Sequence, residues 1–242
     1  MSDERRCITD DFSDVETKEL LDSLPSFFSN FDSYDTRALL NWRFDKYTNT
    51  YRQFFNMGQA YMETSVGLID NCVEDVYCKK QDAWIFPILF NAIHGIELYL
   101  KGVNSLLKSY LKLEAEWEME HYNIEGNHDI EQLCKLTVSL IKKMEDTDSQ
   151  KYVLTELEFV QKFISIIYSK TSDMTFARYP IDKKKNEHFY VDSDDNVVVS
   201  LRVLRQWILR LHRILDNMDY FDYLIDEMAA NLSYYNNEWG GY

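Results

Sequence analysis

The feature that most constrains the fold of this chain is its scarcity of residues that interrupt helices. The chain has 242 residues but only seven Gly and three Pro. Because Gly and Pro mark most turns, such low counts favour long uninterrupted helices over many short strands. Hydrophobic residues make up 45% of the sequence, which is enough to form a core. We therefore predict an all-α fold, a bundle of long antiparallel helices.

The longest helices are predicted from apolar and aromatic residues that recur at spacings of three and four. Such spacing places one face of a helix against a core. The pattern extends from about residue 36 to 72 and from about 83 to 122. A third helix opens with "NHDIEQL", where Asn127 or Asp129 can cap the first turn.

The helical period is interrupted once in the C-terminal half of the chain. After a fourth predicted helix at 149–170, the segments "FARYPID", "EHFYV" and "VVVS" have the composition of short strands. The turn-rich segment "DSDDN" separates the last two. This pattern is typical of a β-hairpin. We predict one small hairpin at 176–199 as an insertion in the bundle, and then a helix from about 199 to 217.

The predicted organisation is a helical domain with extensions at both ends. Residues 1–35 form an acidic leader without the apolar segment of a signal peptide. Residues 36–80 form a long N-terminal helix packed on the bundle. Residues 81–235 form the main helical domain with its hairpin, and its last helix leads into an aromatic tail at 236–242.

Charge and cysteine content narrow the function classes. The formal net charge of -15 disfavours a general attraction to nucleic acid or anionic lipid, so an RNA ligand would need a local basic patch. We expect no DNA binding. No segment approaches the length of a membrane span, so we expect no membrane association and a cytoplasmic location. The four Cys lack metal-site spacing, so we expect reduced thiols, no metal and no cofactor.

A line of polar residues crosses the otherwise apolar segment "FNAIHGIELYLKG". His94, Glu97 and Lys101 lie three and four residues apart, so they share one stripe of the helix. The stripe is either the solvent-facing edge of a mostly buried helix or a buried polar network. A network requires partners from other elements, because buried charges must be paired. The candidate partners are His128, Asp129 and Arg178, and we predict that the stripe faces them.

Three segments, in this order, resemble a bacterial group of HEPN-like helical proteins. They are "IHGIELYLKG", "GNHDIEQL" and "FARYPID". In that group a helix with H-x-x-E-x-x-L-K precedes a helix start with H-D-[IL]-x-x-L and a strand with R-Y-P-[IV]-D. The match covers roughly residues 84–218. The resemblance implies an HEPN-like fold for the domain at 81–235.

Active HEPN-like proteins are mostly metal-independent ribonucleases, often of toxin or phage-defence systems. They carry an R-x(4-6)-H motif, whose two side chains meet those of a symmetry mate in a dimer cleft. The segment that fits here is "RQWILRLH", in which six residues separate Arg205 from His212. The resemblance therefore implies a homodimer that cleaves RNA, with Arg205 and His212 as catalytic residues.

Arg205 and His212 also share one side of their predicted helix. A separation of seven positions returns the His to within roughly 20° of the Arg. Both residues fall on the seam between the apolar and polar faces. There an Arg can bind a scissile phosphate while an imidazole deprotonates a ribose 2′-OH. The alternative is an Arg whose stem lies along the core beside an ordinary interfacial His.

Two functions remain open on the sequence alone. The first is an HEPN-like metal-independent RNA endonuclease of a toxin or phage-defence system, acting as a homodimer. The second is a non-catalytic interaction or regulatory module of such a system, which binds a protein partner. In this module, the polar residues described above only hold the helices in register. The negative charge favours the module, and the family resemblance favours the nuclease.

Overall fold

The computed structural model describes most of the chain between residues 48 and 218. The described residues are 28, 38–40, 44, 48–75, 77, 79–115, 124–144, 147–191 and 193–218. The chain divides into two compact units, Met1–Trp42 and Arg43–Tyr242, and the architecture below is that of the second. Most of the acidic leader, the predicted last helix and the aromatic tail lie outside the described residues.

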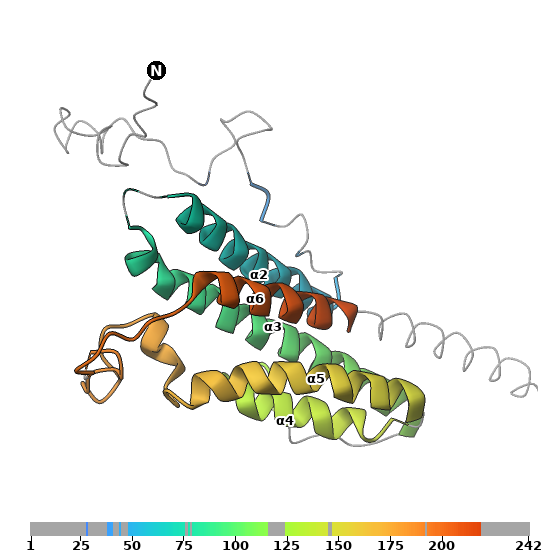
Figure 1. Cartoon of the computed structure of the whole chain (residues 1–242). Coiled ribbons are helices and arrows are strands. Elements are labelled where there is room, and N and C mark those ends of the chain that lie inside the picture. Colours follow the sequence, from blue (N-terminus) through green and yellow to red (C-terminus); the bar gives the residue numbers. More distant parts are fainter. Residues whose placement is uncertain are drawn as a thin grey trace, which may run out of the picture. The chain divides into compact units, whose positions relative to one another are not determined.

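The described part of the second unit is built from helices, as Figure 1 shows. In chain order they are α2 (Thr50–Glu74), α3 (Gln81–Ala115), α4 (Ile130–Ile141), α5 (Thr147–Tyr168), the short 3₁₀ helix η3 (Met174–Ala177) and α6 (Leu201–Asn217). No strand occurs among the described residues. The all-α class predicted from the scarcity of Gly and Pro is therefore confirmed.

Helix α3 lies at the centre of this unit. It packs against α2, α4 and α6, and α6 also contacts α2 and α5 (Figure 1). Ile88, Ala92 and Ile96 are fully buried on α3. Because they lie four residues apart, they form one continuous apolar row along the helix. The core of the unit is therefore assembled around α3.

Helices α2 and α3 approach each other closely at two glycines. A Cβ atom added to Gly58 of α2 would lie 2.9 Å from the Tyr99 ring and 3.1 Å from the carbonyl oxygen of Gly95. A Cβ atom added to Gly95 of α3 would lie 2.7 Å from the buried Met62 side chain. Neither position has room for a larger residue. The absence of a side chain at both positions allows the two backbones to pack directly against each other.

The apolar character of α3 corrects one expectation from the sequence. The stretch Gln81–Leu111 is long and apolar enough to cross a membrane by length and composition. Half of its most apolar window is buried within the protein. A core helix of this kind has the same composition as a membrane span, because both are surrounded by apolar groups.

A buried polar contact sets the register between α3 and α4. Asn104 of α3 donates a hydrogen bond to the carbonyl oxygen of Leu133 at 3.0 Å. Its own side-chain oxygen accepts a hydrogen bond from the Thr137 hydroxyl at 2.8 Å. Since an unpaired amide would be costly in this core, the two helices are held where both contacts form.

The first predicted helix begins later than its apolar pattern suggests. Residues 38–40, 44, 48 and 49 are described and are not helical, and α2 begins at Thr50. Asn49 is the N-cap residue, with non-helical backbone angles. Apolar spacing alone does not locate a helix start, because a segment with the same spacing can pack without being helical.

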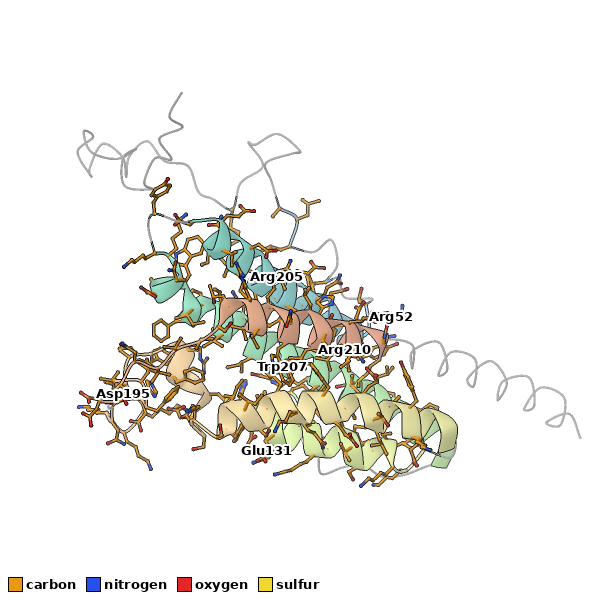
Figure 2. All side chains as sticks on the ribbon, viewed as in Figure 1. Arg52, Glu131, Asp195, Arg205, Trp207 and Arg210 are labelled. Carbon is orange, nitrogen blue, oxygen red and sulfur yellow. The ribbon has the colours of Figure 1, made fainter. Side chains whose placement is uncertain are left out.

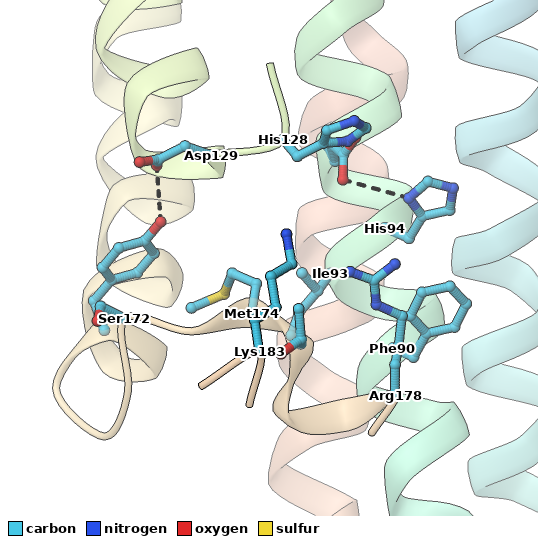
Figure 3. A pocket seen from close by; sticks show the side chains of 12 residues that line it. Phe90, Ile93, His94, His128, Asp129, Ser172, Met174, Arg178 and Lys183 are labelled. Carbon is cyan, nitrogen blue, oxygen red and sulfur yellow. Dashed lines mark hydrogen bonds and ion pairs between the residues drawn. The ribbon is translucent and has the colours of Figure 1, made fainter. Parts of the chain in front are cut away.

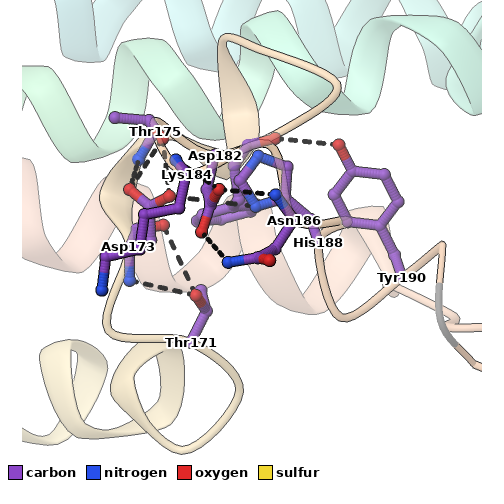
Figure 4. A network of polar contacts seen from close by, with 9 residues as sticks. Thr171, Asp173, Thr175, Asp182, Lys184, Asn186, His188 and Tyr190 are labelled. Atoms are coloured by element: carbon purple, nitrogen blue, oxygen red, sulfur yellow. Dashed lines mark hydrogen bonds and ion pairs between the residues drawn. The ribbon is translucent and has the colours of Figure 1, made fainter.

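The predicted hairpin at 176–199 is not confirmed by the described residues. The segment around Arg178 is the end of η3 rather than a strand. A single isolated antiparallel bridge joins Ile181 to Glu187. The loop inside this bridge is closed by Asp182, whose carboxylate accepts hydrogen bonds from the backbone N–H groups of Lys184 and Asn186, both at 2.7 Å (Figure 4). These local bonds replace a strand ladder.

The segment "EHFYV", predicted as a strand, does not form one, and its aromatic side chains pack against α3 and η3. Tyr190 lies against Phe86 of α3 with ring centroids 5.2 Å apart, and its hydroxyl donates to the carbonyl oxygen of Phe176 at 3.2 Å. Phe189 packs on Phe176 at 5.6 Å. The composition that predicted a strand is therefore explained by burial of these rings against α3 and η3.

Candidate functional site

Glu97, in the middle of α3, is the centre of a polar network. Its Oε1 lies 2.9 Å from Lys101 Nζ and 2.9 Å from His128 Nδ1. Its Oε2 lies 3.5 Å from His94 Nδ1. Lys101 is buried and also donates a hydrogen bond to the backbone carbonyl of Glu125 at 2.9 Å. The structure therefore brings the α3 stripe together with the start of α4.

The surroundings of Glu97 keep its carboxylate ionised. Burial alone would raise its pKa, because a buried charge loses hydration. Hydrogen bonds from His94, Lys101 and His128 outweigh burial and lower the pKa to about 2. Glu97 thus carries a fixed negative charge at neutral pH, which the neighbouring donors share.

The two histidines differ in how they are held. His94 is stacked on Phe90, with ring centroids 5.5 Å apart, and the edge of the Tyr61 ring contacts it at 4.6 Å. This aromatic packing fixes the plane of the His94 ring. The His128 side chain is 76% exposed and is held mainly by Glu97. One imidazole is therefore rigid, whereas the other has room to rotate.

Asp129 holds the start of α4 beside the network. As N-cap residue, it accepts hydrogen bonds from the backbone N–H groups of Glu131 and Gln132 at 3.0 and 3.1 Å. The Tyr168 hydroxyl at the end of α5 donates a further hydrogen bond to the same oxygen at 2.8 Å. In the described part of the chain, Asp129 forms no hydrogen bond or ion pair with Glu97 or the histidines, so its role is to position the segment that carries His128.

The network opens onto a pocket of about 380 Å³ between α3, the start of α4 and the η3 loop (Figure 3). Two basic residues of the loop line it, Arg178 and Lys183. The guanidinium of Arg178 lies over the Phe90 ring, 5.7 Å from its centroid. Within the described part of the chain, neither cation forms an ion pair. The pocket therefore combines two imidazoles with two cations that are available to an anionic ligand.

The hydrogen bonds of the two histidines leave the same ring atom of each available. An ionised carboxylate only accepts hydrogen bonds, so the proton on each imidazole is directed to Nδ1. Neither Nε2 has a hydrogen-bond partner among the described residues. The Nε2 atom of one histidine can therefore accept a proton from a ligand. The Nε2 atom of the other histidine, when its ring is protonated, can donate a proton to the ligand.

The structure places Arg205 against a carboxylate rather than in this pocket. Its guanidinium donates from both Nε and Nη2 to the two oxygens of Asp70 on α2, the second contact at 3.0 Å. The hydrogen bond from Arg205 holds the pKa of Asp70 below its ordinary value. This two-point contact occupies the Nε–Nη2 edge of the guanidinium, one of the two edges with which an Arg can hold an oxyanion.

His212 lies two turns further along α6 and faces a different part of α2. Its Nε2 is 4.0 Å from Glu63 Oε1, and its ring contacts Tyr99 edge-on with centroids 6.1 Å apart. The Nε2 atom is buried and has no hydrogen-bond partner among the described residues. Neither Arg205 nor His212 lines the pocket beside Glu97. Each instead contacts its own acidic residue on α2.

Several residues of the pocket were not singled out by sequence reasoning. Phe90 lies four residues before His94 on α3, so helical spacing alone would have suggested that the two rings stack. Lys183 begins the basic run "KKK" at 183–185, which has no helical spacing that would place it beside the stripe. It lies in the irregular loop closed by Asp182, and Tyr168 is 39 residues from its partner Asp129. Only the packing of the helices brings these side chains to the pocket.

Among the described residues, no group of three or more His, Cys, Asp and Glu side chains is placed to hold a metal ion. Comparison of the chain with protein-family models, curated proteins and solved structures finds no match.

Proposed function

We propose that this protein is a metal-independent RNA endonuclease whose active site is the pocket beside Glu97. The observation that carries the proposal is the pair of imidazoles bonded through Nδ1 to one ionised carboxylate, on a pocket lined by two cations without ion pairs. RNA cleavage without a metal requires a base, an acid and positive charge near the phosphate. The pocket contains side chains for each of these requirements.

The reaction uses the neutral Nε2 of one histidine to remove the proton from a ribose 2′-OH. The 2′ oxygen then attacks the adjacent phosphorus, and the bond from phosphorus to the 5′ oxygen breaks. The second histidine, protonated, gives its Nε2 proton to that leaving oxygen. The products are a 2′,3′-cyclic phosphate and a 5′-OH end. Arg178 and Lys183 offset the negative charge that develops on the phosphate oxygens.

The roles of the two histidines follow from how they are held. His94 is fixed by Phe90 and Tyr61, so it suits a step that needs one orientation, removal of the 2′-OH proton. His128 is largely exposed and can follow the departing oxygen. Glu97 orients both rings and stabilises whichever one carries the second proton.

The local charge of the pocket supports an RNA substrate despite the net charge of -15. Lys184 and Lys185 directly follow Lys183, so the loop side of the pocket is basic. Substrate approach would depend on this local patch, since the rest of the chain repels polyanions.

A non-catalytic interaction module is the second candidate. The contact between Arg205 and Asp70 favours it, because it gives the Arg of the R-x(4-6)-H motif a structural role between α6 and α2. The membership in the HEPN-like group and the homodimer both stay proposals. They rest on the order of the three resembling segments in the sequence.

The test is incubation of the purified full chain with total RNA in the presence of EDTA. We expect cleavage by the wild type and 2′,3′-cyclic phosphate ends on the products. His128→Ala should lower the rate by about 100-fold or more, the usual scale for losing a general acid or base. Because His128 is exposed, this change should leave the fold intact. Lys183→Ala should also slow cleavage, and Lys151→Ala, the matched control at an exposed position near the start of α5 and outside the pocket, should not.

Arg205→Ala and His212→Ala in the same assay separate the two candidate sites. We expect both variants to cleave RNA at the wild-type rate. Loss of cleavage in these two, with full activity of His128→Ala, would move the active site to α6. If the wild type cleaves no RNA, the interaction module replaces the nuclease.

A further inference from the structure

A segment with strong strand-forming composition lies unpaired on the surface of this protein. Val197, Val198 and Val199 are 42%, 84% and 40% exposed. β-branched residues favour extended backbone that pairs with a neighbouring strand. No hydrogen bond of the described residues involves the backbone of these three valines, and they belong to no helix or strand. Their backbone donors and acceptors are therefore available to another chain.

The same three valines border a second pocket, of about 620 Å³. This pocket lies between the start of α3, η3 and the loop that leads to α6. Its apolar lining includes Ile85, Phe86 and Leu89 of α3. It does not include any residue of the pocket beside Glu97. An unpaired segment beside an apolar pocket is the arrangement by which proteins bind an extended peptide, whose backbone pairs while a side chain enters the pocket.

The rim of this second pocket is acidic. Asp194 and Asp195 precede the valines, and Asp82 lies at the first turn of α3. Figure 2 shows Asp195 on the loop that leads to α6. All three residues are exposed, and none forms an ion pair within the described part of the chain. The pocket also lacks any Lys or Arg among its lining residues. An acidic rim around an apolar floor favours a ligand that combines positive charge with apolar side chains.

We propose that Val197–Val199 and this pocket bind an extended segment of a partner protein in which apolar side chains alternate with Lys or Arg. The partner segment pairs with the three valines as an added strand. Its apolar side chains enter the pocket beside Phe86, and its basic side chains meet Asp194 and Asp195. This site is independent of the proposed RNA cleavage.

The test uses a fluorescein-labelled synthetic peptide of alternating valine and lysine, with fluorescence anisotropy on the full chain. We expect saturable binding at physiological salt, and no binding of a matched peptide with glutamate in place of lysine. The double variant Asp194→Lys, Asp195→Lys should weaken binding at least about tenfold, because it places like charges in contact. Val198→Pro should weaken it to a similar extent, since proline removes a strand hydrogen bond.

The controls separate this site from general attraction to an acidic protein. Glu158→Lys, on the exposed face of α5, changes the charge at a distance from the pocket and should leave binding unchanged. If Glu158→Lys weakens binding as much as the double variant, or Val198→Pro has no effect, the proposal is wrong. It is also wrong if the protein without peptide self-associates in sedimentation and Val198→Asp abolishes that association, because the face then binds a second copy of this chain.

Discussion

At the scale of single residues, the most constrained position is Glu97. A carboxylate and an ammonium group, both nearly buried, lose most of their hydration in the folded protein. Their attraction offsets that loss only because the remaining hydrogen-bonding positions are also filled. His94 and His128 fill those of Glu97, and the carbonyl of Glu125 fills one of Lys101. The network is therefore stable as a unit and most sensitive to the loss of its buried members, Glu97 and Lys101.

We predict that Glu97→Gln destabilises the fold by about 3 kcal/mol, because it leaves Lys101 buried without a counter-charge. Urea denaturation followed by circular dichroism measures this change. The matched control is Glu131→Gln, which breaks the exposed pair between Glu131 and Lys135. We expect almost no change there, since exposed ion pairs contribute little. Equal effects of the two substitutions would contradict a buried network.

The pKa of Glu97 also predicts how stability depends on pH. Its folded-state pKa is about 2, below its ordinary value of 4.5. A lowered folded-state pKa means that the contribution of Glu97 is complete above about pH 4.5 and is lost as the pH falls towards 2. The difference in unfolding free energy between wild type and Glu97→Gln should therefore shrink over that window. A difference that stays constant from pH 5 to pH 3 would contradict this assignment.

At the scale of elements, the α2–α3 contact depends on glycine. Three atoms of the α3 backbone and of the Tyr99 side chain would lie within 3.2 Å of a Cβ at Gly58. The helices have to approach this closely for Ser65 of α2 to donate its hydrogen bond to the carbonyl oxygen of Ile88, at 2.9 Å. Any side chain at Gly58 would separate the helices and weaken the packing of the central core.

Two glycines on the same helix provide a matched comparison. We expect Gly58→Ala to destabilise the protein by roughly 1–3 kcal/mol, because it overpacks the contact with α3. Gly67→Ala, with no atom within 4 Å of the added Cβ, should stabilise it by about 0.5–1 kcal/mol through reduced backbone entropy in the unfolded chain. Thermal denaturation distinguishes the two. Stabilisation by both substitutions would show that the helices are not in close contact.

The segment between α5 and α6 illustrates how a local sequence pattern can satisfy its backbone without forming a sheet. Asp173 caps η3 by accepting from the N–H and hydroxyl of Thr175, and Asp182 closes the next loop. His188 is buried, with Nδ1 4.0 Å from Asp173 Oδ2 (Figure 4). These side chains use the hydrogen bonds that a hairpin would have formed across strands.

At the scale of the whole molecule, acidic residues outnumber basic ones by 41 to 26. The two pockets nevertheless differ in charge. The pocket beside Glu97 carries Arg178 and Lys183 on its loop side, whereas the pocket beside the valines carries Asp82, Asp194 and Asp195. The loop between α5 and α6 contributes to both pockets, with its basic residues to one and its acidic residues to the other. One irregular segment thus supplies two surfaces that suit ligands of opposite charge.

Much of the architecture is encoded in local patterns. Scarce Gly and Pro predicted the helical class, and helical spacing placed His94, Glu97 and Lys101 on one line. Asp129 was one of the two residues proposed to cap α4, and it does so. These features depend on residues within a few positions of each other, where helix geometry and hydrogen bonding at the cap leave little choice.

Contacts between distant parts of the chain could not be predicted in this way. The helical wheel placed Arg205 and His212 together on one seam of α6, but their partners lie on α2, and Asp70 is 135 residues before Arg205. A wheel shows which residues share a face and does not show which helix covers it. The pairing of Arg205 with Asp70 was decided by the packing of α6 against α2.

The sequence by itself therefore determined the helical class of the described region, the polar stripe on α3 and the cap of α4, because these follow from short-range geometry. Only the tertiary structure decided that Glu97 gathers His128 from another element, that Arg178 ends a 3₁₀ turn, and that the three valines remain unpaired. Each of these outcomes depends on which surfaces meet when the helices pack. The packing arrangement lowers the unpaired charge and the exposed apolar area of the whole unit together. It therefore cannot be predicted from the sequence of any single segment.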